Sequence, residues 1–207
     1  MTSLIGSLQG RDIVENMNKT KLVNSLRENI KNEPPKAFHL DGFQRAAVLV
    51  PILLGPVGLE VLFTVRSLNL TNHPGQIAFP GGKVEQGEGV VNAARRETFE
   101  EIGLNIECGS IVGRLDDISS PAGYVATPVV AIHQKQDVLK LNPGEVSEAF
   151  RIELKELLDA EPTVEIGQRF GRDREVFTYS VGKRKIWGFT ASILHNLLRI
   201  LRTLHCL

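Results

Sequence analysis

The sequence predicts an α/β fold, an α+β sandwich in which helices flank a mixed β-sheet. The chain has 207 residues, 42% hydrophobic and 23% charged, which suits one folded domain better than two domains or a disordered chain. Short runs of β-branched and aliphatic residues recur along it and predict strands. Longer segments before, between and after these runs have apolar residues at helical spacing.

The first of these segments is a helix expected over 18–32. It stops before Pro34 and Pro35, which cannot continue a helix. We expect this helix to pack on the main domain. The chain is therefore divided into an N-terminal helical extension, 1–40, and the principal domain, 41–207.

The strands follow. Two apolar runs, 45–54 and 59–66, flank a glycine turn and predict a hairpin with Arg66 at its exit. A short helix is expected over 155–160. Further strands are expected over 110–115, 124–133, 148–154, 174–181 and 184–189.

A helix rich in glutamate is expected over about 90–102. Gly87 and Gly89 mark the turn into it, and Gly103 is well placed to end it as a left-handed cap residue. At about 100° per residue, one side of this helix can lie against the sheet. That side consists of Val91, Ala94, Thr98 and Ile102.

Glu97, Glu100 and Glu101 share a neighbouring face of the same helix. Like charges four residues apart destabilise a helix, and negative charges near its C-terminus oppose its dipole. A face that serves only solvation would gain from lysines here. We therefore expect a cation between the carboxylates, and Mg²⁺ or Mn²⁺ is the kind of ion that prefers oxygen ligands. Arg96, four residues before Glu100, can orient a carboxylate.

The last helix is expected over 190–204. Its broad apolar stripe is typical of a helix that packs on a core or forms a homodimer, and these interpretations are favoured over membrane binding.

The composition excludes several partners. The 24 basic and 24 acidic residues cancel, so no overall field attracts nucleic acid or an anionic membrane. Cys108 and Cys206 are too few for a disulfide framework or a tetrahedral zinc site. The N-terminus has no apolar run typical of a signal peptide. We expect a small-molecule substrate and a cytoplasmic location.

The glutamate helix and its glycines resemble the Nudix box, a 23-residue loop–helix–loop signature. The matching residues are Gly82, Glu88, Arg96, Glu97, Glu100, Glu101, Gly103 and Leu104. Thr98 departs from the pattern, which prefers an aliphatic residue there, and it falls on the side expected to face the sheet. The resemblance implies a metal-dependent hydrolase of nucleoside diphosphates linked to another moiety.

The segment upstream of the box, 62–82, resembles the additional signature of coenzyme A pyrophosphatases within this superfamily. Phe63 replaces a leucine of that signature, and Thr71 stands where it has an arginine. The resemblance implies cleavage of coenzyme A to 3′,5′-ADP and 4′-phosphopantetheine. Two alternatives stay open: a Nudix hydrolase of NADH, ADP-ribose or a nucleoside triphosphate, and a ligand-binding module without catalysis.

The resemblance also implies roles for individual residues. Catalysis is assigned to Glu97, Glu100, Glu101 and Arg96. The metal ligands are Glu97, Glu100, Glu101 and the carbonyl of Gly82. Substrate binding is assigned to Arg66, Gly81, Gly82 and Tyr124. Two alternatives stay open: Arg66 is equally suited to cap the strand at the surface, and Tyr124 is better explained by packing. Glu88 is expected to brace the loop through Arg95 or Arg96. A carboxylate from outside the box is expected to join the site, and the candidates are Glu145, Glu148 and Asp117.

Overall fold

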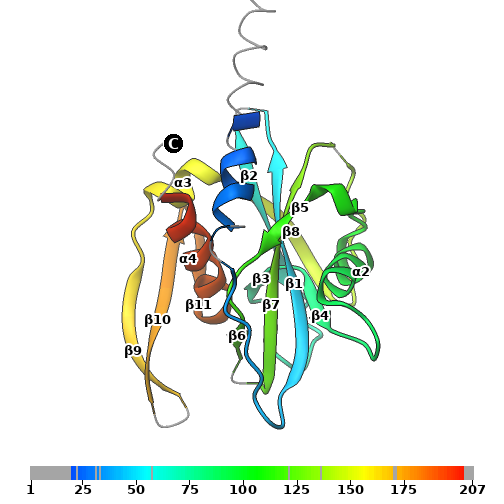
Figure 1. The fold of residues 1–207 in the computed structure, drawn as a ribbon. Coiled ribbons are helices and arrows are strands. Elements are labelled where there is room, and N and C mark those ends of the chain that lie inside the picture. Colours follow the sequence, from blue (N-terminus) through cyan, green and yellow to red (C-terminus); the bar gives the residue numbers. More distant parts are fainter. Residues whose placement is uncertain are drawn as a thin grey trace, which may run out of the picture.

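The computed structural model describes residues 20–202, apart from 22, 31, 33, 57, 121, 136, 170 and 171. Two sheets and three labelled helices make up most of this part of the chain (Figure 1). The strands of the larger sheet are β1 Gln44–Leu54, β2 Leu59–Arg66, β3 Ile77–Ala78, β4 Gly81–Lys83, β5 Ile111–Arg114, β6 Ile118–Ser119, β7 Tyr124–His133 and β8 Val146–Glu153. The smaller sheet contains β9 Thr163–Arg169, β10 Arg172–Val181 and β11 Arg184–Trp187. The helices are α2 Val90–Ile102, α3 Leu154–Asp159 and α4 Gly188–Arg202.

The larger sheet is mixed, as the sequence predicts. Its central pair, β1 and β7, is parallel, whereas the other pairings are antiparallel. Near its end β1 pairs with β2, but over 46–48 its neighbour on the same side is β4. This exchange of neighbours brings the glycines of β4 beside the middle of β1, where α2 packs.

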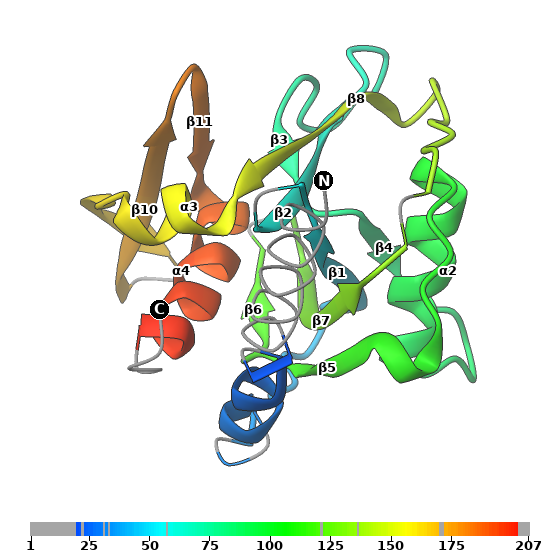
Figure 2. The same cartoon turned by 90° about the horizontal axis from the view of Figure 1, so that it is seen from above.

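Helices cover both faces of the larger sheet. Seen from above, α2 lies on one face, and α4 with the smaller sheet lies on the other (Figure 2). A cluster of buried aliphatic side chains joins α2 to the sheet. A larger cluster fills the space among the sheet, α4, β10 and β11. The apolar stripe of α4 therefore packs in the core, with Leu194, Leu197 and Leu198 fully buried.

The leading segment packs on this second core. Residues 20, 21, 23–30 and 32 are helical, and Val23, Leu26 and Ile30 are buried in the larger cluster. Gly113 of β5 makes room for this contact, because a Cβ there would lie 2.2 Å from Cγ2 of Ile30. The division of the chain at residue 40 stays a prediction. Residues 18, 19, 203 and 204, parts of the predicted terminal helices, lie outside the described residues.

Among the described residues, no helix is long and apolar enough to cross a membrane.

Candidate active site

Helix α2 begins and ends where the sequence predicts. Gly103 adopts the left-handed conformation at φ 70°, and its N–H donates to the carbonyl of Phe99. Thr98 is fully buried against the sheet, and its hydroxyl donates to the carbonyl of Ala94 at 2.7 Å. The hydroxyl at this position is thus satisfied inside the helix, so the departure from the box pattern leaves no unpaired polar group.

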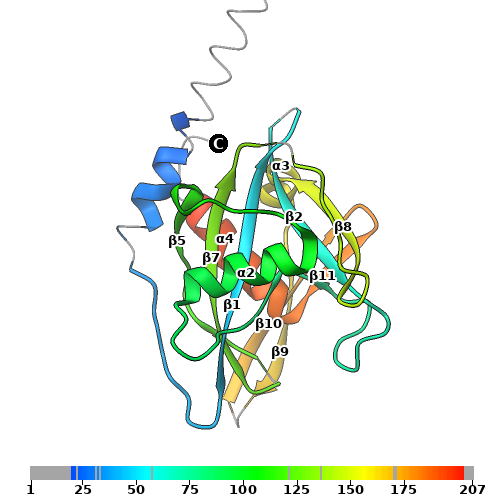
Figure 3. The ribbon, with the colours of Figure 1, turned by 90° about the vertical axis from the view of Figure 1, so that its right-hand side faces the viewer.

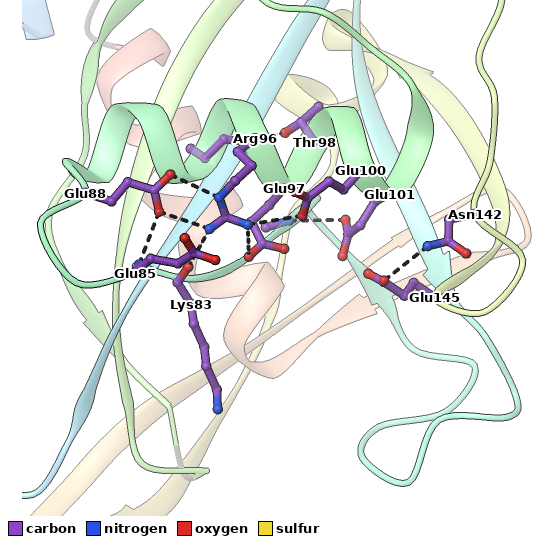
Figure 4. Close-up of polar contacts among 12 residues, drawn as sticks. Lys83, Glu85, Glu88, Arg96, Glu97, Thr98, Glu100, Glu101, Asn142 and Glu145 are labelled. Carbon is purple, nitrogen blue, oxygen red and sulfur yellow. Dashed lines mark hydrogen bonds and ion pairs between the residues drawn. The ribbon is translucent and has the colours of Figure 1, made fainter.

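Arg96 is the centre of the polar contacts on α2 (Figure 4). Its Nε and Nη2 each donate to the Glu88 carboxylate at 3.0 Å, and Nη2 also donates to the carbonyl of Lys83. Its Nη1 donates to Glu97 at 2.9 Å and to Glu100 at 3.1 Å. The hydrogen bond from Arg96 lowers the pKa of Glu88. Glu88 therefore braces the loop through Arg96, while Arg95 donates to the carbonyl of Ile106 instead.

Glu97 points toward the backbone of β4. A Cβ on Gly82 would lie about 2.5 Å from all three atoms of the Glu97 carboxyl group, so glycine is required for this approach. Burial raises the pKa of Glu97; the hydrogen bond and charge of Arg96 oppose this rise, and the charges of Glu100 and Glu145 add to it. The Glu97 carboxylate thus lies between a cation on its own helix and carboxylates on its other side.

Glu101 is the most buried carboxylate of the helix, with 5% of its surface exposed. Its Oε2 accepts the N–H of Gly81 at 3.2 Å. Burial raises the pKa of Glu101 to about 8, the charges of Glu145 and Glu97 add to the rise, and Arg66 opposes it. Within the described part of the chain, Glu101 forms no ion pair. The three glutamates therefore differ: Glu101 faces inward, whereas the side chain of Glu100 is about half exposed.

Glu145 is the carboxylate from outside the box that the fold brings to this site. It lies just before β8, faces Glu101 in Figure 4, and its charge raises the pKa of both Glu97 and Glu101. The other two candidates have partners elsewhere. Glu148 pairs with Arg184 of the smaller sheet. Asp117 is held by Arg45 at 2.8 Å and by Thr127 at 2.6 Å.

Arg66 is a cation whose charge acts on Glu101, and within the described residues it forms no ion pair. It ends β2, and its charge lowers the pKa of Glu101. Its Nε has only a long contact, 3.4 Å, with the carbonyl of Asn72. Tyr124 lies at the start of β7, and the Nζ of Lys83 lies 5.9 Å from the centre of its ring. The charge of Arg66 thus acts on the carboxylates, whereas the ring of Tyr124 lies near the last residue of β4.

The segment between β2 and β4 frames the carboxylates. In the side view, α2 lies in front of the strands β1 and β2, and the loop after β2 extends beyond them (Figure 3). The N–H of Ser67 donates to the carbonyl of Glu145 at 2.8 Å, and Ser147 donates to the carbonyl of Val65. The end of β2 therefore holds the start of β8, from which Glu145 projects.

The residues present suit a hard divalent cation in their chemistry. Glu97, Glu101 and Glu145 offer carboxylate oxygens, and the desolvation that raises the pKa of Glu101 is relieved when a cation binds beside it. Within the described part of the chain, however, no three His, Cys, Asp or Glu side chains converge closely enough to form a complete site by themselves. Glu97 and Glu100 are turned toward Arg96 instead.

The fold and this arrangement define a Nudix protein. The NUDIX domain model matches residues 43–172, so the chain belongs to the Nudix family. Nudix enzymes generally use divalent metal ions such as Mg²⁺ or Mn²⁺. Membership of the family supports the hydrolysis of a nucleoside diphosphate derivative as the activity of this chain.

Two bacterial relatives carry the name uncharacterized Nudix hydrolase NudL. The relative from Photorhabdus laumondii is 35% identical over 167 residues, which cover 79% of this chain and 88% of that protein. The relative from Pectobacterium atrosepticum is 34% identical, with coverage of 79% and 86%. The solved structure of RenU, a Nudix hydrolase from M. smegmatis, matches with a TM-score of 0.53 at 20% identity and covers 80% of this chain and 89% of that one. This likeness shows the fold alone.

Proposed function

We propose that the protein hydrolyses the pyrophosphate bond of coenzyme A or its derivatives with Mg²⁺ or Mn²⁺, giving 3′,5′-ADP and 4′-phosphopantetheine. The position of segment 62–82, which resembles the coenzyme A pyrophosphatase signature, carries this proposal. Its first part contains Arg66, whose charge acts on Glu101. Its last part contains Gly81 and Gly82, which contact Glu101 and Glu97. The residues that would select the substrate therefore adjoin those that would hold the ion.

Glu97, Glu101 and Glu145 would hold the ion, with Glu100 and the carbonyl of Gly82 as further ligands. A bound ion offsets charge on the pyrophosphate and lowers the pKa of a bound water. Arg96 fixes the orientation of Glu97 through the 2.9 Å hydrogen bond and ties the loop to the helix through Glu88. Tyr124 would line the substrate site from the start of β7.

In the proposed reaction, a water oxygen forms a bond to one phosphorus, and the bond from that phosphorus to the bridging oxygen breaks. Glu97 or Glu145 orients the water and accepts its proton. Arg66 binds a phosphate oxygen, and hydrogen bonds of this kind to a charged group contribute roughly 1.5 to 3 kcal/mol. The carboxylates stay unmodified throughout, so no covalent enzyme intermediate is needed.

Thr71 is the observation that favours a second candidate function. The coenzyme A signature has an arginine at this position, and the chain lacks it. The same site would therefore also suit NADH, ADP-ribose or a nucleoside triphosphate. The complete set of box carboxylates supports catalysis over a ligand-binding module without activity. A small molecule, rather than nucleic acid or a membrane, is the partner of this proposal, and the cytoplasmic location stays a prediction.

A substrate panel tests the proposal. Purified protein is incubated with coenzyme A, NADH, ADP-ribose and ATP, each with Mg²⁺ and with Mn²⁺, and the products are separated by chromatography. We expect the highest kcat/KM for coenzyme A or an acyl derivative, with 3′,5′-ADP as a product. Negligible cleavage of coenzyme A beside rapid turnover of another compound would reject the coenzyme A assignment and leave the family activity standing.

A further inference from the structure

Glu101 and Glu145 place like charges together on two separate segments of the chain. Glu101 belongs to α2, and Glu145 lies in the loop before β8. Figure 4 shows their two carboxylates facing each other, so the two side chains repel each other when both are ionised. No described lysine, arginine or histidine forms an ion pair with Glu145. The described contact of the Glu145 side chain is instead with an uncharged group.

The side chain of Asn142 makes this contact. Its Nδ2 donates to Oε1 of Glu145 at 3.1 Å, as Figure 4 shows, and its Oδ1 accepts the N–H of Gly144 at 3.1 Å. These two bonds fix the orientation of the amide. Turning it over would set the NH₂ group against an N–H and the carbonyl against a carboxylate.

The backbone of Asn142 connects the same residue to α2. Its N–H donates to the carbonyl of Glu101 at 2.8 Å, and its carbonyl accepts the N–H groups of Glu145 and Val146. A single residue thus touches the end of the glutamate helix with its main chain and the Glu145 carboxylate with its side chain. Any displacement of Asn142 changes the position of Glu145 relative to Glu101.

We propose that Asn142 is a positioning residue that holds the Glu145 carboxylate toward Glu101, so that the two charges together attract a divalent ion. This inference rests on the proposed function, in which Glu101 and Glu145 receive that ion. An amide suits this role because it donates a hydrogen bond without cancelling charge. A lysine or arginine in its place would satisfy Glu145 and compete with the ion.

The test is a double-mutant cycle that measures Mn²⁺ binding to the metal-free, full-length protein by calorimetry. Because outer partners of metal ligands contribute tenfold or more to affinity, we expect Asn142→Ala to weaken Mn²⁺ binding roughly tenfold. Glu145→Gln weakens it at least as much. The double variant binds no more weakly than Glu145→Gln alone, because Asn142 acts through Glu145. The kcat for the best substrate falls in the same pattern, whereas KM changes little.

Two further variants separate positioning from a general effect on the fold. Asn142→Ser keeps an acceptor for the Gly144 N–H but is too short to reach Glu145, so it should lose Mn²⁺ affinity like Asn142→Ala while its Tm stays near that of wild type. Asn105→Ala, at an exposed asparagine beyond the same end of α2, should bind Mn²⁺ normally.

The outcomes distinguish this inference from the proposed function. If Glu145→Gln binds Mn²⁺ as wild type does, the role of Glu145 in the proposed function is wrong, and the role of Asn142 falls with it. If Glu145→Gln weakens binding but the Asn142 variants do not, or if the two effects add, only the inference about Asn142 is overturned.

Discussion

At the scale of single residues, the burial of Glu101 favours the proposed ion site over a solvated helix face. A carboxylate that is 5% exposed, with a pKa raised to about 8, gains nothing from water. The neighbouring charges of Glu145 and Glu97 raise that pKa further. Such an arrangement costs stability in the metal-free protein and is offset when a cation binds.

The pH dependence of stability tests this cost. The pKa of Glu101 rises from an ordinary value of 4.5 to about 8 on folding. Below about pH 4.5 the Glu101 carboxyl group is protonated in both states and does not lower the free energy of unfolding. As pH rises from there toward 8, the metal-free protein loses stability. We expect Glu101→Gln to be more stable than wild type at pH 8, by an amount on the order of 4 kcal/mol, but not at pH 4.5. Thermal unfolding in a chelating buffer measures the difference.

The control is Glu153→Gln, at an exposed glutamate of β8, which should show no such change with pH. A stability difference between Glu101→Gln and wild type that stays constant from pH 4.5 to pH 8 would contradict the buried, repelled state of Glu101.

Gly82 provides a prediction about geometry. In Gly82→Ala, the new Cβ would overlap the Glu97 carboxylate, so Glu97 must move from its place beside β4. We expect kcat to fall by roughly 100-fold or more, because a displacement of about 1 Å has this effect on catalytic groups. Gly58→Ala, where a Cβ meets no atom within 4 Å, should keep full activity. Equal activity of the two variants in steady-state assays would contradict the assigned position of Glu97.

The sequence identifies the carboxylates of α2 because helical spacing fixes their positions on one element. It does not choose among Glu145, Glu148 and Asp117, since that choice depends on tertiary pairing. Arg184 and Arg45, remote in sequence, engage two of the three. The sequence reasoning did not predict the hydrogen bond from Asn142 to Glu145. A signal for it exists, because an asparagine followed by Pro143 and Gly144 is typical of a turn.

At the scale of elements, the end of β4, the loop 84–89 and α2 form one unit through Arg96. The guanidinium binds the carbonyl of Lys83, the Glu88 carboxylate and two glutamates of its own helix. Glu88 also accepts the N–H of Glu85, which closes the loop. These contacts require the planar, five-donor group of arginine.

Replacing Arg96 therefore tests the coupling of loop and helix. In Arg96→Lys the single ammonium cannot serve both Glu88 and Glu97, so we expect the amides of Glu85 and Glu88 to exchange hydrogen at least tenfold faster. Hydrogen exchange read by NMR checks this. Amides in the middle of β7 serve as the internal control. Unchanged exchange in the loop would show that Arg96 does not hold it.

The elements that sequence reasoning missed share a physical reason. The strand β9 has Val164 and Ile166 exposed, so it lacks the buried alternation that predicts a strand, and it exists through its pairing with β10. β3, β4 and β6 have two or three residues each and are defined by their partners in the sheet. Strands with buried faces, such as β1, β2 and β7, were predicted to within a residue or two.

At the scale of the whole molecule, the larger sheet separates two cores with different tasks. The core under α2 contains small side chains, Ala47, Ala93 and Ala94, which let the glutamate helix approach the sheet closely. The other core contains α4, the smaller sheet and the leading helix. The residues of the proposed active site thus rest on a scaffold that is packed on both faces.

Leu26 tests whether the leading helix belongs to this scaffold. Its side chain is fully buried in the larger core, so we expect Leu26→Ala to destabilise the whole domain by about 2 to 4 kcal/mol in denaturant unfolding. Asn24→Ala, at an exposed position of the same helix, should change stability by less than about 0.5 kcal/mol. A Leu26→Ala protein as stable as wild type would show that the segment is a separate appendage.

The central claim is that the buried Glu101 on α2 and the half-buried Glu145 before β8 are held together in order to bind a divalent ion. A calorimetric titration of Mg²⁺ and of Mn²⁺ into the wild-type protein and into Glu101→Gln tests it most directly. The account predicts saturable binding by the wild type and at least tenfold weaker binding by Glu101→Gln. Equal binding by the two proteins, or none by the wild type with or without coenzyme A present, would contradict it.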